Sequence, residues 1–110
     1  MPSHRLEKLN SLIQQELGFI IKEEVELPID SLITVSKVDT SVDIKHTNVY
    51  ISVIPKNKAV SVIKKLNHNV YHLQQALNRK LVIHFVPKIR FVLDHSEEHA
   101  ERIEKILAKI

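Results

Sequence analysis

The first two dozen residues repeat apolar side chains every three or four positions, which is the spacing of one face of an α-helix. Ser3 is predicted to cap the N-terminus of this helix, and Pro28 and Asp30 place its end near Glu24. Gly18 lies in the interior, where close packing would explain a residue that disfavours helix. The predicted buried face consists of Leu6, Leu9, Ile13, Leu17, Ile20 and Ile21.

Two strands are predicted after this helix. Residues Leu32–Thr40 are rich in Leu, Ile, Val and Thr, and Asn48–Ile54 alternate apolar with mostly polar side chains. Thr40–Asp43 has the composition of a turn or bulge, and Pro55 ends the second strand because it cannot donate to a sheet. The short link predicts an antiparallel hairpin.

A second helical pattern covers about Lys58 to Asn78. Its weak point is the run 66–69, Leu-Asn-His-Asn, where three poor helix formers occur together. A kink or break there would divide the segment into two shorter helices. The predicted buried face consists of Val60, Ile63, Leu66, Val70, Leu73 and Leu77.

Residues Leu81 to Leu93 alternate strictly and predict a long third strand, with a bend or an edge position at Pro87. Ser96 is predicted to cap a last helix, about 96–109, that need not be as ordered as the rest. One face of the strand is predicted to hold Leu81, Ile83, Phe85, Ile89, Phe91 and Leu93.

The predicted order is helix, strand, strand, kinked helix, strand and helix, which is the order of the type II, or prokaryotic, KH fold. At 110 residues the chain is expected to form one α+β domain over 1–110, with two layers and the helices on one face of a three-stranded sheet. Its predicted core consists of Leu6, Leu9, Ile13, Leu17, Val49, Ile51, Val53, Leu73, Ile83, Phe85 and Phe91.

Charge changes this picture of a plain small domain. The stretch from Ile44 to Leu93 has no Asp or Glu, although the chain has 13 acids and a net charge of only +3. A basic centre between acidic ends favours an anionic partner such as nucleic acid, although such lysines can also be a solvated surface. The predicted RNA-binding residues are the nine cations of this stretch, Lys45, Lys56, Lys58, Lys64, Lys65, Arg79, Lys80, Lys88 and Arg90.

Composition removes several kinds of chemistry. There is no Cys, which excludes disulfides and fits a reducing cytoplasm, and neither a signal peptide nor a membrane span is expected. The only Gly is Gly18, so a Gly-x-x-Gly clamp, a phosphate-binding loop and a Gly-x-Ser-x-Gly elbow are all excluded. We therefore expect no catalytic residues and no cofactor.

Histidines and tyrosines leave two further possibilities open. His68 and His72 share one helix face, but the metalloprotease pattern is missing, so exposed histidines without a metal are expected there. The pair His95 and His99 has the same spacing, but His95 precedes the predicted cap. Tyr50 and Tyr71 are the aromatic residues that could stack on bases.

The ordered set of motifs along the chain resembles the ribosome-binding factor A family over nearly its whole length. The first half of the match comprises Arg5-Leu6, Ile13, Glu16, Leu17 and Ile20, then Thr34-Val35-Ser36-x-Val38, Ser41-x-Asp43-Ile44 and Val49-Tyr50-Ile51-Ser52-Val53. The second half comprises Pro87-x-Ile89-x-Phe91-x-Leu93-Asp94-x-Ser96, followed by Ile103 and Leu107.

The resemblance implies a KH-like domain in which an Ala-x-Gly kink replaces the Gly-x-x-Gly loop. It implies a cytoplasmic, non-catalytic assembly factor that binds the small (30S) ribosomal subunit. Such a factor aids late 16S rRNA processing, notably in the cold, beside assembly GTPases. The chain departs from the pattern where the kink aligns with Asn69-Val70-Tyr71, and at Gln74, where the family usually has Arg. Asn69 is expected to serve at the break because Asn tolerates left-handed backbone.

We therefore predict a monomeric factor that binds 16S rRNA and the small subunit through phosphate contacts. Two alternatives stay open. One is a protein-interaction module that docks on an acidic protein through the same basic patch or the acidic last helix. The other is a His-dependent metal site.

Overall fold

A computed structural model describes residues 4–83 and 85–96 of the chain. The predicted Ser3 cap and nearly all of the predicted last helix lie outside these residues. None of the helices in the described part is long and apolar enough to cross a membrane. The elements are α1 (His4–Glu24), β1 (Leu32–Thr40), β2 (His46–Ile54), the 3₁₀ turn η1 (Lys56–Lys58), α2 (Ala59–His68), α3 (Val70–Lys80) and β3 (Lys88–Leu93).

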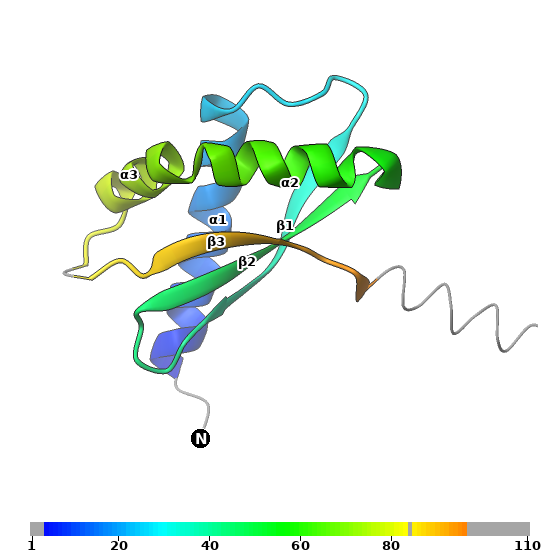
Figure 1. Cartoon of the computed structure of the whole chain (residues 1–110). Helices are drawn as coiled ribbons and strands as arrows, with labels where there is room; N and C mark the ends of the chain where they lie inside the picture. Colours follow the sequence, from blue (N-terminus) through cyan, green and yellow to red (C-terminus); the bar gives the residue numbers. More distant parts are fainter. Residues whose placement is uncertain (1–3, 84, 97–110) are drawn as a thin grey trace, which may run out of the picture.

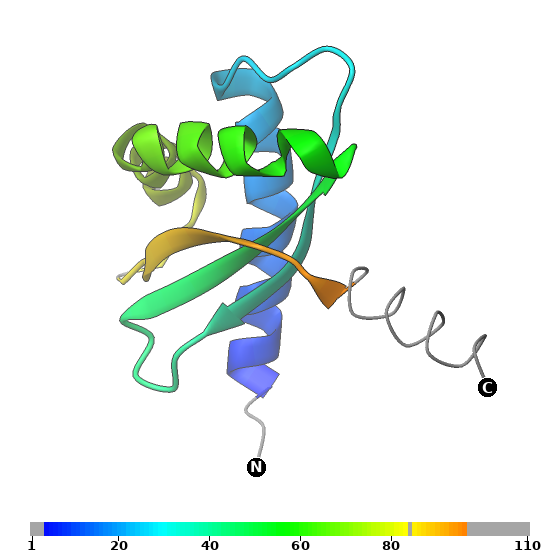
Figure 2. The same cartoon turned by 45° about the vertical axis from the view of Figure 1, so that its right-hand side comes forward.

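The three strands form one sheet in the order β1-β2-β3. β1 and β2 make the predicted antiparallel hairpin, and β3 runs parallel to β2 after a crossover through α2 and α3. In both views α1 passes behind the strands while α2 lies along β3 (Figures 1 and 2). The α+β class and the predicted order of elements are confirmed over the described residues.

The core lies between the sheet and the helices. Alternate residues of β2, from Thr47 to Val53, point inward and are buried, as alternation predicts. They meet Ile13 and Leu17 of α1 and Leu73 of α3, which are 0% exposed. Full burial of one such side chain contributes about 1.5–3 kcal/mol, so these contacts dominate the stability of the domain.

The predicted break in the second helical segment is confirmed at Asn69, between α2 and α3. The predicted face of α2 was wrong at its start, because Val60 is 64% exposed. Ala59 and Val62 are buried in its place. Ala59, Val62 and Leu66 are spaced 3 and 4 and share one helix face, whereas the predicted spacing of 3 and 3 from Val60 turns away from that face within α2 itself.

The predicted long third strand was wrong in its first half, since β3 comprises only Lys88–Leu93. Ile83 and Phe85, which were expected in the core, are 42% and 80% exposed. The reason is the length of the partner strand. β2 begins at His46 opposite Lys88, so the residues before Lys88 have no neighbouring strand with which to pair.

The expected close packing at Gly18 was also wrong. A Cβ built on Gly18 would have no heavy atom of another element within 4 Å. The residue is partly exposed on α1. No contact in the described structure therefore requires glycine at this position.

Candidate nucleic-acid interface

Two side-chain amides hold the free edge of β3 against the helices. Asn67 Nδ2 donates to the carbonyl of Phe91 at 3.2 Å, and the Phe91 N–H donates to Asn67 Oδ1 at 3.3 Å. Gln74 does the same two residues earlier, accepting from the Ile89 N–H at 2.9 Å and donating to the Pro87 carbonyl at 3.2 Å. The amides take the place of a fourth strand, which fixes β3 and leaves the edge without unpaired groups at these positions.

Asn69 forms the break without the expected left-handed conformation, since its φ is −98° and its ψ is 12°. Its side chain donates to the Lys65 carbonyl at 2.8 Å, and its N–H lies 3.1 Å from the carbonyls of Lys65 and Leu66. Its own carbonyl accepts from the Leu73 N–H at 3.0 Å and starts α3. Asn69 therefore ends one helix and begins the next through hydrogen bonds that a negative φ allows.

No helix within residues 4–83 and 85–96 covers the side of the sheet away from the core, and this side carries mostly polar residues. We call this surface the open face. Register places Lys88 beside His46, and Arg90 beside Asn48, on the same side of the sheet. The open face comprises Lys37 and Asp39 of β1, His46, Asn48 and Tyr50 of β2, and Lys88, Arg90 and Val92 of β3. The same side of the hairpin continues through Thr34 and Ser52 to the exposed apolar partners Leu32 and Ile54, which we do not include in the open face.

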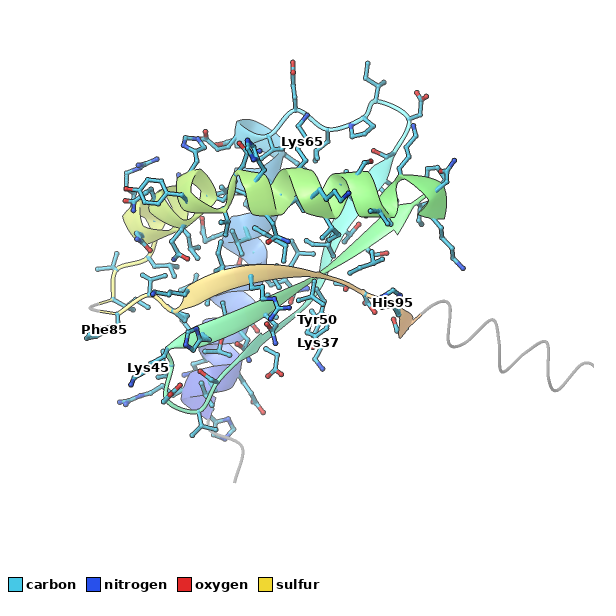
Figure 3. The ribbon with its side chains drawn as sticks, in the orientation of Figure 1. Lys37, Lys45, Tyr50, Lys65, Phe85 and His95 are labelled. Carbon is cyan, nitrogen blue, oxygen red and sulfur yellow. The ribbon has the colours of Figure 1, made fainter. Side chains whose placement is uncertain are left out.

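Lys37 and Tyr50 form the centre of this surface. They are register partners, and the Lys37 ammonium lies 5.6 Å from the centroid of the Tyr50 ring, within the range of a cation–π contact. Figure 3 shows both side chains leaving the strands together, away from α2. Lys37 faces outward because a β-bulge between Val35 and Lys37 exposes two successive residues, Ser36 and Lys37.

The loop between β1 and β2 holds Lys45 beside the open face. Asp43 Oδ1 accepts from the Ser41 hydroxyl at 2.6 Å and from the Lys45 N–H at 3.2 Å. These two hydrogen bonds, the Ser41 one first, hold the pKa of Asp43 below its ordinary value. The Lys45 carbonyl accepts from the Lys88 N–H at 3.0 Å, which joins the loop to the start of β3.

Six of the predicted RNA-binding cations lie elsewhere, on η1, α2 and α3. Lys58 is half-buried and pairs with Asp30 at 3.6 Å, whereas Lys64 and Lys65 are exposed. In Figure 3 Lys65 extends from α2 on the other side of the strands from Lys37. The structure therefore divides the predicted basic centre into a sheet group and a helix group, the latter comprising Lys56, Lys58, Lys64, Lys65, Arg79 and Lys80.

The end of β3 is tied to the bulge of β1. The Ser36 hydroxyl donates to Asp94 Oδ2 at 2.5 Å, and the Ser96 N–H donates to Asp94 Oδ1 at 2.8 Å. The Asp94 N–H donates to the Ile51 carbonyl at 2.8 Å. The Ser36 bond, followed by those from Ser96, lowers the pKa of Asp94 below its ordinary value of 3.8.

Sequence reasoning missed Lys37, His46 and Asn48 as members of the open face. Lys37 lies outside the acid-free stretch, so counting charges does not select it. Strand alternation alone places His46 and Asn48 on the same side as Tyr50, so that signal was present in the sequence.

No group of three or more His, Asp or Glu side chains within the described residues could hold a metal ion. His72 instead faces Glu24 of α1, with its Nε2 2.6 Å from a carboxylate oxygen. His99 lies outside the described residues.

Comparisons with known proteins show which family the chain is similar to. A family model described as Ribosome-binding factor A matches residues 5–107. A relative of that name from Protochlamydia amoebophila (strain UWE25) is 33% identical over 112 residues, which cover 100% of this chain and 86% of the relative.

Solved structures agree on the fold. The crystal structure of ribosome-binding factor A from Thermus thermophilus matches with a TM-score of 0.72 and 20% identity, over 83% of this chain and 97% of that one. A homology model of the Thermus thermophilus factor, fitted into a cryo-electron-microscopy map of its complex with 30S, matches with a TM-score of 0.69 and 23% identity, over 80% of this chain and 93% of that one.

Proposed function

The chain belongs to the ribosome-binding factor A family, and we propose that it is an RNA-binding assembly factor of the small ribosomal subunit. It contacts 16S rRNA, acts in late maturation of that RNA, notably in the cold, and works beside other assembly factors including a GTPase. It acts in the cytoplasm as a monomer and catalyses no reaction. The homologous protein fitted into a 30S complex supports this role.

One observation carries the proposal, namely the charge of the open face. Three cations, Lys37, Lys88 and Arg90, share it with a single acid, Asp39. Lys45 adds a fourth cation at its margin, where the acids Asp43 and Asp94 are both held in hydrogen bonds to neighbouring hydroxyl and N–H groups. Cations spread over strands that no described helix covers suit phosphates along an RNA backbone, which gives affinity with little sequence readout.

The polar groups of the open face suit RNA further. Asn48 and His46 lie between the cations and offer hydrogen bonds to bases or riboses. Tyr50 is partly exposed beside Lys37, so its ring edge or face is available to an unpaired base. Exposed cations of the helix group, among them Lys64 and Lys65 of α2, offer a second contact on the opposite side of the domain.

The test is sedimentation of the tagged full chain with purified small subunits and with their precursors, at two or more salt concentrations. Binding through phosphates should weaken with salt, with a log–log slope of about −0.7 to −0.9 for each phosphate neutralised. Precursor subunits should bind more tightly than mature ones. A flat salt response, or equal binding after the RNA of the particle has been digested, contradicts the proposal.

A further inference from the structure

An apolar groove opens between the first half of α1, the β1–β2 loop and the segment that precedes β3. Its volume is about 890 Å³. Val82 and Phe85 stand 99% and 80% exposed in it, and Leu12 and Ile83 are 40% and 42% exposed. Leu9 and Ile44 complete its apolar lining.

More exposed apolar residues meet here than in two smaller hollows of the described chain, one lined by Phe19 and Leu32 and the other by Ile29. Val60 on α2 lies outside the groove, and so does Ile29 in the loop before β1. Single exposed apolar residues are ordinary on protein surfaces, whereas a hollowed patch with a polar rim marks an interaction site. Val82, Ile83 and Phe85 lie before the first residue of β3 that pairs with β2, so their exposed side chains are available to a partner.

The rim of the groove is cationic. Arg5 and Lys8 alternate with Leu9 and Leu12 along one stripe of α1, and Lys45 lies on the opposite rim. No side-chain ion pair within residues 4–83 and 85–96 engages Arg5, Lys8 or Lys45. Asp43, the one acid at the rim, is held by the Ser41 hydroxyl and the Lys45 N–H.

The backbone conformation of Ile44 is a second, independent indication that the groove is a binding site. Its φ is 59°, and it is the one non-glycine residue with a positive φ in the described part of the chain. This left-handed conformation is unfavourable for a β-branched side chain, and such outliers gather at binding sites. Here the conformation places an apolar side chain in the groove, where Asn or Gly would relieve the backbone.

We propose that this groove binds an acidic amphipathic helix of a partner protein. The apolar side chains of that helix would fill the lining between Leu12 and Phe85, and its acidic flanks would face Arg5, Lys8 and Lys45. RNA offers no continuous apolar surface to such a lining, and a lipid surface is flat where this site is concave. The groove lies apart from the open face except at Lys45, so the proposal goes beyond RNA binding and identifies a second partner.

The probe is a designed peptide of three helical turns with Leu at every third or fourth position and Glu elsewhere. A matched peptide carries Lys in place of each Glu. Titration into the ¹⁵N-labelled full chain should shift the amide signals of Leu12, Ile44, Val82 and Ile83 with the acidic peptide. The Lys peptide should bind at least about tenfold more weakly, because its charges oppose those of the rim.

Single substitutions distinguish an effect on the groove from an effect on folding. Phe85→Ser should lower the affinity for the acidic peptide about tenfold or more, since Phe85 is a large exposed side chain in the groove. Val60→Ser removes an exposed apolar side chain elsewhere and should change nothing. Asn tolerates the left-handed backbone, so the Ile44→Asn variant should keep the NMR spectrum of the folded chain. It should still bind the acidic peptide with lower affinity, because it lacks the apolar side chain. Phe85→Ser should leave salt-dependent binding to small subunits unchanged.

Four results would overturn the proposal. The first is equal binding of the acidic and Lys peptides, and the second is equal weakening by Phe85→Ser and Val60→Ser. The third is a dimer, detected by sedimentation equilibrium, that dissociates in the Phe85→Ser variant, which would assign the groove to a second copy of the chain. The fourth is tighter binding to phosphatidylserine vesicles than to the acidic peptide, which would assign it to a lipid surface.

Discussion

The carboxamide of Asn67 bonds to both the N–H and the carbonyl of Phe91, at 3.3 and 3.2 Å. A side chain on α2 thereby completes the backbone hydrogen bonding of an edge strand. Gln74 repeats the arrangement at Ile89 and Pro87, seven residues further along the helices. The open face depends on these contacts because β3 carries Lys88 and Arg90.

The first prediction concerns Asn67. Asn67→Ala removes both bonds and should lower the free energy of unfolding by about 1–3 kcal/mol, because Phe91 is 2% exposed and its N–H and carbonyl lose these partners. Asn67→Asp should cost about 2 kcal/mol, since a carboxylate accepts from the Phe91 N–H but repels its carbonyl. Urea unfolding measures both values. Asn57→Asp on η1 is the matched control, and a cost for Asn67→Asp no larger than that of the control would refute the assigned role.

The second prediction concerns Gly18. Because no heavy atom of another element lies within 4 Å of a Cβ built there, Gly18→Ala should raise the free energy of unfolding by about 0.5–1 kcal/mol. The variant is more stable because Ala has less backbone entropy than Gly in the unfolded chain, so less entropy is lost on folding. Thermal unfolding at fixed pH provides the measurement. A lower melting temperature in the variant would mean that α1 has a close neighbour at this position.

The third prediction concerns the pH dependence of the Ser36–Asp94 bond. The folded state lowers the pKa of Asp94 below 3.8, so the bond stabilises the fold above that pH. Its contribution is lost as the pH falls through the folded-state value. A double-mutant cycle with Ser36→Ala and Asp94→Asn should give a coupling of about 1 kcal/mol at pH 7, a modest value because both side chains are partly exposed.

The same cycle should give no coupling once Asp94 is protonated in both states. Unfolding by denaturant at a series of pH values from 7 downward measures this loss. A coupling that stays constant over the whole range would show that the charge of Asp94 does not contribute to the bond.

Local signals in the sequence predicted much of the fold. β1 begins at Leu32 and ends at Thr40 as its composition predicts, and the three poor helix formers before Val70 mark the break. Both features depend on residues close together in the chain. Periodicity and propensity are sufficient for features of that kind.

Features that depend on distant residues were not predictable in this way. The alternation through Ile83 and Phe85 is ideal for a strand, but β2 begins too late to pair with that segment. The amides of Asn67 and Gln74 meet β3 only after the crossover has formed. Lys37 joins the open face through a bulge that the composition of its own strand does not indicate. Of the nine predicted cations, the structure places Lys88 and Arg90 on the open face and Lys45 at its margin.

The role of the open face in RNA binding is best tested by comparing two double charge reversals for binding to precursor small subunits. Lys37→Glu with Arg90→Glu alters the open face, and Lys64→Glu with Lys65→Glu alters α2 by the same charge. We predict that the open-face variant has the lower affinity of the two. Its salt slope should also be smaller, by about 0.7–0.9 for each phosphate that it no longer neutralises. Unchanged binding by the open-face variant, together with failure of the α2 variant to bind, would contradict this role.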